Sequence, residues 1–83
     1  MNTEHLIDMA NQIGAFFASQ PNREEALNGI AEHIRRYWEP RMRRAFLAAL
    51  DDLAGTAGQQ ISPIVREAVT RYRDKLTPAA VAA

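Results

Sequence analysis

The sequence predicts an all-α protein, built as a small bundle of four helices, and three observations lead to this class. Apolar residues recur every three or four positions along most of the chain, as they do in helices with one buried face. No segment alternates apolar and polar residues with the period of two that marks a half-buried strand. Each of the four prolines falls where one of these periodic segments begins or ends.

The first helix is expected over residues 4–19. Asn2 or Thr3 can cap its start, and Gln20 ends it because a residue before proline disfavours helical geometry. Two apolar stripes run along this segment, which predicts contacts on more than one of its sides. One stripe consists of Leu6, Met9, Ala10, Ile13, Phe16 and Phe17, and the other of Ile7, Ala10, Gly14 and Phe17.

The second helix is expected over residues 23–38 and begins at a capping box formed by Asn22 and Glu25. Its apolar stripe consists of Leu27, Ile30, Ala31, Ile34 and Trp38. Glu39 and Pro40 end it, and Pro40 suits the first position of a third helix over residues 40–53. The apolar face of that helix consists of Met42, Ala45, Phe46, Ala49, Leu50 and Leu53.

A glycine-bounded segment, residues 55–58, is expected to be a flexible break. Ser62 and Pro63 then open a fourth helix over residues 63–76 as its cap and first residue. Its inward positions are Ile61, Ile64, Val65, Ala68, Val69, Tyr72 and Leu76. Residues 1–76 are therefore predicted to form a single helical domain, and the alanine-rich residues 77–83 a flexible tail.

Composition limits the classes of protein that the chain can belong to. It has no cysteine, which excludes disulfides and thiolate metal sites. The N-terminus lacks the basic and apolar regions of a signal peptide, and the longest uncharged run, Met9 to Asn22, is too short and polar to span a bilayer. A cytoplasmic protein is expected.

No catalytic, cofactor-binding or metal site is predicted. His5 lies near Glu4 and Asp8, but this spacing is not the H-E-x-x-H pattern of a helical zinc site. The serines at positions 19 and 62 lie at helix boundaries, where capping explains them. The adjacent acids at positions 51 and 52 do not face each other on a helix, and the glycines of residues 55–58 lack the lysine of a phosphate loop.

Basic residues cluster in the middle of this neutral chain. Residues 35–44 contain five of its ten basic residues. Counting acids against bases, residues 1–30 carry a net charge of −3, residues 31–50 carry +3, and residues 51–83 balance. One interpretation is a solvated helix surface, on which Glu32 and Glu39 pair with nearby arginines.

Protein docking is the function that this cluster favours. Tyrosine, tryptophan, methionine and arginine are enriched at interfaces and hot spots, and Pro40 would hold such residues at a rigid corner between two helices. Arginine can also hold a carboxylate with two parallel hydrogen bonds. The predicted partner-binding residues are Tyr37, Trp38, Arg41, Met42, Arg43 and Arg44. For Trp38 the alternative is burial against Ile34 and Phe46.

Two other functions compete with docking. The second and third helices could form a helix-turn-helix that binds nucleic acid, although the neutral charge and acidic flanks oppose contact with phosphates. Alternatively, the isolated chain could self-associate through the small residues Ala10, Gly14 and Ala18, which are four positions apart and permit close helix contact.

Several motifs resemble those of a known family, the delta subunit of soluble NAD-dependent formate dehydrogenases that contain molybdenum or tungsten. The motifs are M-A-N-Q-I at residues 9–13, the pair Phe16-Phe17 followed by Pro21, and H-I-R-R-Y-W-E-P-R-M-R at residues 33–43. The last motif is the most specific. The resemblance is strong over residues 5–53 and weaker over residues 61–76, where Ser62-Pro63 and an apolar helix follow.

The resemblance implies a small accessory subunit that supports the assembly or stability of a cytoplasmic complex oxidising formate with NAD. In that family the bis-pterin molybdenum or tungsten cofactor and iron–sulfur clusters belong to the alpha subunit. FMN, the NAD site and further clusters belong to the beta and gamma subunits. The resemblance therefore implies a chain without redox cofactors that docks on the alpha subunit.

Overall fold

The computed structural model describes residues 2–52 and 55–78, and every regular element in this part of the chain is a helix. The helices are α1 (Thr3–Ala18), α2 (Arg23–Tyr37), α3 (Pro40–Asp51), α4 (Thr56–Gln59), α5 (Pro63–Arg71) and α6 (Arg73–Leu76). The predicted all-α class is confirmed.

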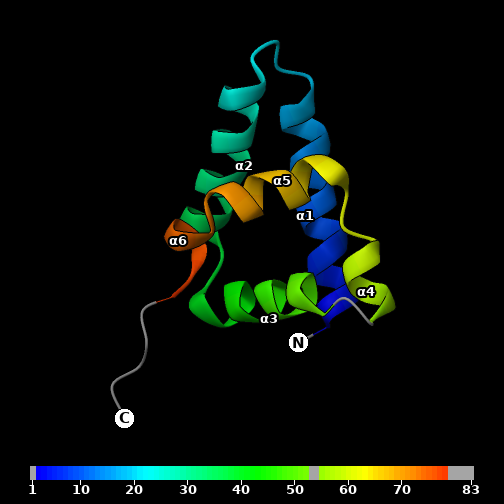
Figure 1. Ribbon diagram of the computed structural model, residues 1–83. Helices are drawn as coiled ribbons and strands as arrows, with labels where there is room; N and C mark the ends of the chain where they lie inside the picture. Colours follow the sequence, from blue (N-terminus) through cyan, green and yellow to red (C-terminus); the bar gives the residue numbers. More distant parts are fainter. Residues whose placement is uncertain (1, 53–54, 79–83) are drawn as a thin grey trace.

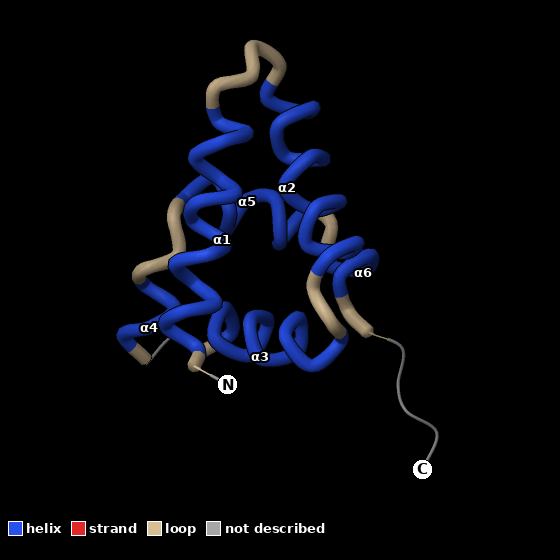
Figure 2. Tube along the Cα trace, turned by 180° about the vertical axis from the view of Figure 1, so that it is seen from behind, coloured by secondary structure: helices blue, strands red, loops and turns tan. Residues whose placement is uncertain are grey.

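The helices form a crossed arrangement around one hairpin (Figure 1). α1 and α2 run in opposite directions and meet at the turn after Ala18, while α3 lies across the wide end of the hairpin. α5 crosses α1 and α2 on one face, and the view from behind shows α1 and α2 on the other face (Figure 2). A bundle of four helices is not confirmed, because α3 and α5 lie across the other two long helices.

Local signals set most of the helix boundaries. The side-chain oxygen of Asn2 accepts from the backbone N–H of His5 at 3.3 Å, and that of Asn22 accepts from the N–H of Glu25 at 3.1 Å. Both prolines expected at first helical positions begin their helices, α3 and α5. Ser62 is the N-cap residue of α5, as predicted, but its side chain makes no capping hydrogen bond.

The predicted fourth helix, 63–76, is in fact two helices. The chain bends at Tyr72, whose backbone angles (φ −105°, ψ 26°) depart from helical values, and α6 turns Leu76 into the core. The predicted break at 55–58 is also partly helical, since α4 begins at Thr56. Gly58 permits this, because a Cβ atom there would lie 2.4 Å from the carbonyl oxygen of Ala49. Leu53 and the tail beyond Pro78 lie outside the described residues.

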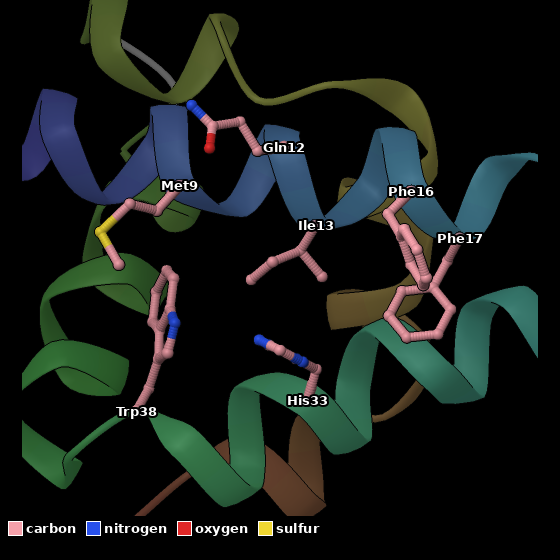
Figure 3. A pocket seen from close by; sticks show the side chains of 7 residues that line it. All are labelled: Met9, Gln12, Ile13, Phe16, Phe17, His33 and Trp38. Atoms are coloured by element: carbon pink, nitrogen blue, oxygen red, sulfur yellow. The ribbon is translucent and has the colours of Figure 1, made fainter.

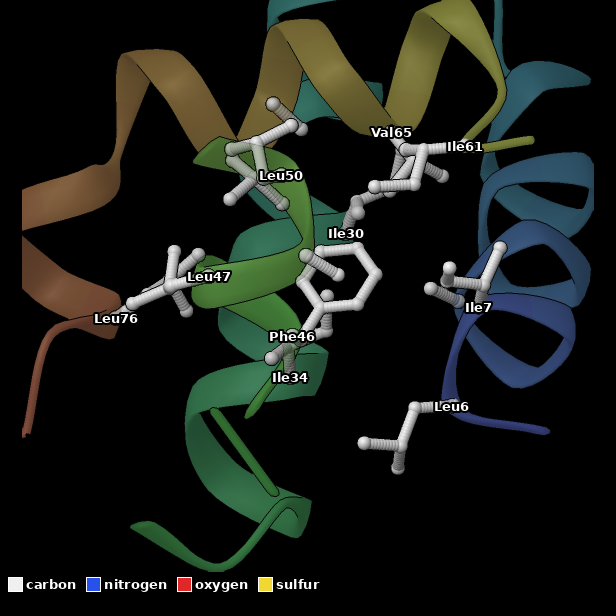
Figure 4. Close-up of a cluster of buried hydrophobic side chains, with 14 of the residues drawn as sticks. Leu6, Ile7, Ile30, Ile34, Phe46, Leu47, Leu50, Ile61, Val65 and Leu76 are labelled. Atoms are coloured by element: carbon white, nitrogen blue, oxygen red, sulfur yellow. The ribbon is translucent and has the colours of Figure 1, made fainter. Parts of the chain in front are cut away.

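The core lies where α1, α2, α3 and α5 converge (Figure 4). Phe46 of α3 occupies its centre, and α6 adds Leu76 beside Leu47. The largest fully buried side chains are Phe46, Ile7, Leu27, Ile30, Ile34, Leu76, Val65 and Val69. Each long helix thus contributes one apolar face, as the three-to-four-residue spacing predicts.

Candidate functional site

A tight corner joins α2 to α3. Trp38 and Glu39 adopt extended backbone angles, and Pro40 is the first residue of α3. The pyrrolidine ring fixes φ near the helical value, so the direction in which α3 starts is restricted. The corner therefore holds the side chains before and after Pro40 in a defined arrangement.

The structure divides the six predicted partner-binding residues into two groups. Tyr37, Arg41 and Arg44 face solvent, and Tyr37 has 71% of its surface exposed. Neither arginine of this group lies within ion-pair distance of a carboxylate among residues 2–52 and 55–78. We call these three residues the corner cluster.

Trp38 and Met42 lie on the inner side of the corner. Trp38 is only 4% exposed, and its ring meets that of Phe46 edge-on with the centroids 5.6 Å apart. Such perpendicular pairs are favourable because the positive edge of one ring meets the negative face of the other. Met42 packs partly buried against the same core. Of the two interpretations of Trp38, the structure supports burial in the core.

Arg43 also points inward. Its Nη1 donates to the carbonyl oxygen of Leu76 at 3.3 Å, and its Nε is buried without a hydrogen-bond partner in the described part of the chain. A cation beside the last carbonyls of a helix is favourable. Arg43 therefore links α3 to the end of α6, which gives it a structural role.

Arg35 and Arg36, in the last turn of α2, are paired within their own helix. Nη2 of Arg35 donates to Glu32 at 2.8 Å, and Nε of Arg36 lies 3.7 Å from the same carboxylate. The hydrogen bond from Arg35 lowers the pKa of the Glu32 carboxyl. The solvated-surface interpretation is thus confirmed for these two residues. Glu39, however, pairs with no arginine among the described residues.

An apolar groove lies between α1 and α2, on the face away from α5 (Figure 3). Its volume is about 440 Å³. Ile13 of α1 and His33 of α2 point into it from opposite sides, and Trp38 closes one end. The lining residues are Met9, Gln12, Ile13, Phe16, Phe17, His33 and Trp38. We call this surface the α1–α2 groove.

Aromatic contacts connect the groove to the corner. Phe16 and Phe17 pack edge-on with centroids 5.1 Å apart, and the ring of Phe17 lies 6.5 Å from that of His33. His33 in turn lies 4.8 Å from Tyr37 of the corner cluster. Phe16 is 71% exposed. Sequence reasoning missed His33 and Phe16 as site residues, and the apolar stripe of α1 that contains Met9, Ile13 and Phe16 was the signal that could have identified the groove.

The small residues proposed for self-association are mostly inside the fold. Ala10 and Gly14 are buried, and a Cβ atom at Gly14 would lie 2.5 Å from Cγ2 of Val65. The close helix contact that Gly14 permits is therefore made with α5 of the same chain. Self-association through Ala10 and Gly14 was a wrong expectation, because both residues are already buried inside the fold.

The described residues show neither a cluster of metal ligands nor a helix that could span a membrane. Across residues 2–52 and 55–78, no three or more His, Cys, Asp or Glu side chains are grouped so that they could hold a metal ion. No helix in the described part of the chain combines the length and hydropathy needed to cross a bilayer.

Comparison with known families gives one match. The model of the family described as NADH-dependent formate dehydrogenase delta subunit FdsD matches residues 5–69. No curated protein and no solved structure matches the chain. The matched segment includes the corner, both sides of the α1–α2 groove, and α5 as far as Val69.

Proposed function

Because the chain belongs to the NADH-dependent formate dehydrogenase delta subunit family, we propose that it is a non-catalytic accessory subunit of the complex. In this proposal it docks on the catalytic alpha subunit through the corner cluster and supports the assembly or stability of the cytoplasmic complex. The observation that carries the proposal is the solvent-facing position of Tyr37, Arg41 and Arg44 around a rigid corner.

The chemistry of the corner cluster suits a protein interface. Tyrosine and arginine are the residue types most enriched among interface hot spots, together with tryptophan. The guanidinium group is weakly hydrated and can bind a carboxylate with two hydrogen bonds, which lowers the cost of its burial. Arg41 and Arg44 have no carboxylate partner among the described residues, so a carboxylate of the alpha subunit would supply one.

Trp38, Met42 and Arg43 support the same surface from behind. Trp38 packs on Phe46, and Arg43 binds the end of α6, so the corner is anchored to α3 and to the C-terminal helix. A contact surface that is rigid before binding loses less conformational entropy when the complex forms. We therefore assign these three residues to positioning the corner cluster.

Redox chemistry is assigned to the partner subunits. Iron–sulfur clusters are held mainly by cysteine thiolates, and this chain contains no cysteine. We propose that the bis-pterin molybdenum or tungsten cofactor belongs to the alpha subunit, with FMN, NAD and further clusters on the beta and gamma subunits. Nucleic-acid binding is not favoured, since family membership offers no support for it.

The test removes the two corner charges from the co-expressed complex. With a purification tag on the alpha subunit, Arg41→Ala with Arg44→Ala should reduce the amount of co-purified chain about tenfold or more, because truncating charged interface contacts raises the off-rate. The circular dichroism of the isolated variant should be unchanged, since both side chains are exposed.

The matched control is Arg23→Ala with Arg71→Ala. It also removes two arginine charges, but from α2 and α5, outside the corner. This control should stay in the complex. Full retention of the corner variant would contradict docking through the corner cluster. Tight binding of the wild-type chain to nucleic acid in a low-salt filter titration, with a steep salt dependence, would favour the helix-turn-helix alternative.

A further inference from the structure

α1 is apolar on two sides, and the described chain covers only one of them. On the covered side, Gly14 touches Val65 of α5, and the side-chain amide of Asn11 binds the backbone of Gln60 and Ser62 at 2.9 Å each. On the other side lies the α1–α2 groove, where Phe16 is 71% exposed. α1 packs against α2, α3 and α5 within the described chain. The strip of its surface that lines the groove is the part that remains open to solvent.

The shape of the groove fits another helix. Its lining on α1 runs from Met9 to Phe17, which corresponds to about 12 Å, or just over two turns, at the rise of an α-helix. The α1 residues lie at spacings of three and four, and they face His33 of α2 and Trp38 of the corner. A valley between two antiparallel helices accepts the side-chain ridge of a third helix.

Charge indicates which end of such a helix meets the corner. The groove ends at Trp38, and Arg41 follows three positions later without a carboxylate partner in the described part of the chain. At the other end, the first turn of α2 carries the exposed Glu25. A bound helix would therefore present a carboxylate at the corner end, where it can pair with Arg41.

We propose that the α1–α2 groove binds an amphipathic helix of the alpha subunit, two to three turns long. Its apolar residues occupy positions i, i+3 or i+4, and i+7, and one carboxylate lies at the end that meets Arg41. This inference rests on the proposed docking function and adds to it a second, apolar contact that is continuous with the corner cluster through Tyr37 and His33.

A charge placed in the groove tests the inference in the full complex. Phe16→Asp, co-expressed with the tagged alpha subunit, should reduce the co-purified chain about tenfold or more, because an unpaired carboxylate would face an apolar helix. The matched control is Ala15→Asp, which places the same charge at an exposed position of α1 that does not line the groove. The control should be retained. Since Phe16 is mostly exposed, the isolated variant should keep its helical circular dichroism.

The results separate this inference from the proposed function. If Phe16→Asp is retained like the control while the Arg41→Ala, Arg44→Ala variant is lost, the groove inference is overturned and docking at the corner stands. Loss of Phe16→Asp alone supports the apolar contact in the groove, but it contradicts docking through the corner and overturns the pairing of the helix carboxylate with Arg41. Dimerisation of the isolated wild-type chain in light scattering, abolished by Phe16→Asp, would show a second copy in the groove and overturn the inference.

Photo-crosslinking identifies the occupant. A benzoylphenylalanine in place of Phe16, in the assembled complex, should crosslink to one short segment of the alpha subunit when irradiated. Mass spectrometry of the adduct should show helical apolar spacing and an acidic residue within two turns of the crosslinked position. Adducts with a second copy of this chain, or no adduct with the alpha subunit, would overturn the inference.

Discussion

The two sides of α1 carry similar apolar residues, but one side is buried in the fold and the other is partly exposed to solvent. On one side, Ile7 and Gly14 are buried, Gly14 lies against Val65 of α5, and Asn11 binds the segment that leads into α5. On the other side, Ile13 is only partly buried and Phe16 is mostly exposed. An apolar stripe thus indicates that a helix face needs a neighbour, but it does not indicate whether that neighbour belongs to the same chain.

Ion pairs are also found on the α5 side and not at the groove. On the side of the α1–α2 hairpin that α5 covers, which we call the closed side, Arg23 of α2 pairs with Glu67 of α5 at 2.5 Å, and Arg71 of α5 pairs with Glu24 of α2. No ion pair among residues 2–52 and 55–78 crosses the groove between α1 and α2. The closed side therefore combines apolar packing with electrostatic contacts, whereas the groove side offers a mainly apolar surface without ion pairs in the described part of the chain.

The largest expected difference between the two sides comes from isoleucine truncation. Ile7→Ala should lower the free energy of unfolding by about 2–5 kcal/mol, because it leaves a cavity in a closed core. Ile13→Ala should cost about 1 kcal/mol, because the groove is already open to water. Urea unfolding of the isolated full chain, followed by circular dichroism, measures both. Equal losses would show that the groove side contributes as much to stability as the core.

A smaller difference is expected from two glycines with similar close approaches. A Cβ atom at Gly14 would lie 2.5 Å from buried, β-branched Val65, which cannot turn away, so Gly14→Ala should destabilise by about 1–2 kcal/mol. A Cβ atom at Gly29 would lie 2.5 Å from the ring of Phe17, at the open groove. That ring can shift, so Gly29→Ala should be neutral or stabilise by up to about 1 kcal/mol through helix propensity. Thermal unfolding gives the sign of each change, and destabilisation by both would mean that the groove is as rigid as the α5 side.

The smallest effect concerns the ion pairs of the closed side. The hydrogen bond from Arg23 lowers the pKa of the Glu67 carboxyl in the folded chain, with Arg71 adding a further attraction. The contribution to stability is therefore present above the ordinary glutamate value of 4.5 and is lost as the pH falls through the lowered pKa. Glu67→Gln should be less stable than wild type at neutral pH, and the two should converge in acid.

Urea midpoints across this pH range provide the measurement. Added salt should shrink the difference at neutral pH, since both partners are exposed. A difference that persisted unchanged below the ordinary glutamate pKa would show that Glu67 acts through packing instead of charge.

Much of the fold was predictable because helix signals are local. Asn22 and Pro40 act within one helical turn, so the starts of α2 and α3 follow from neighbouring residues. The bend at Tyr72 was not predictable from spacing, since it depends on burying Leu76 against α2 and α3, far away in sequence. Ser62 likewise has the sequence of a cap, but its hydroxyl lies buried near Gly14 and makes no such bond.

The candidate site was predictable in part for the same reason. Residue type and the proline corner identified the segment that holds Tyr37, Arg41 and Arg44. Spacing could not separate these from Arg43, because residues on one helix differ in burial according to what packs against each of its sides. The α1–α2 groove required coordinates, since it combines residues from two helices.

The sequence by itself determined the helical class, most helix starts, the basic middle segment and the two apolar sides of α1. All of these depend on interactions within a few residues of each other along the chain. Only the tertiary structure decided that Trp38 is buried, that α5 covers Gly14, and that the groove beside Phe16 stays open. These outcomes depend on which helix, distant in sequence, packs against each face. That choice is determined by the close packing of the whole molecule.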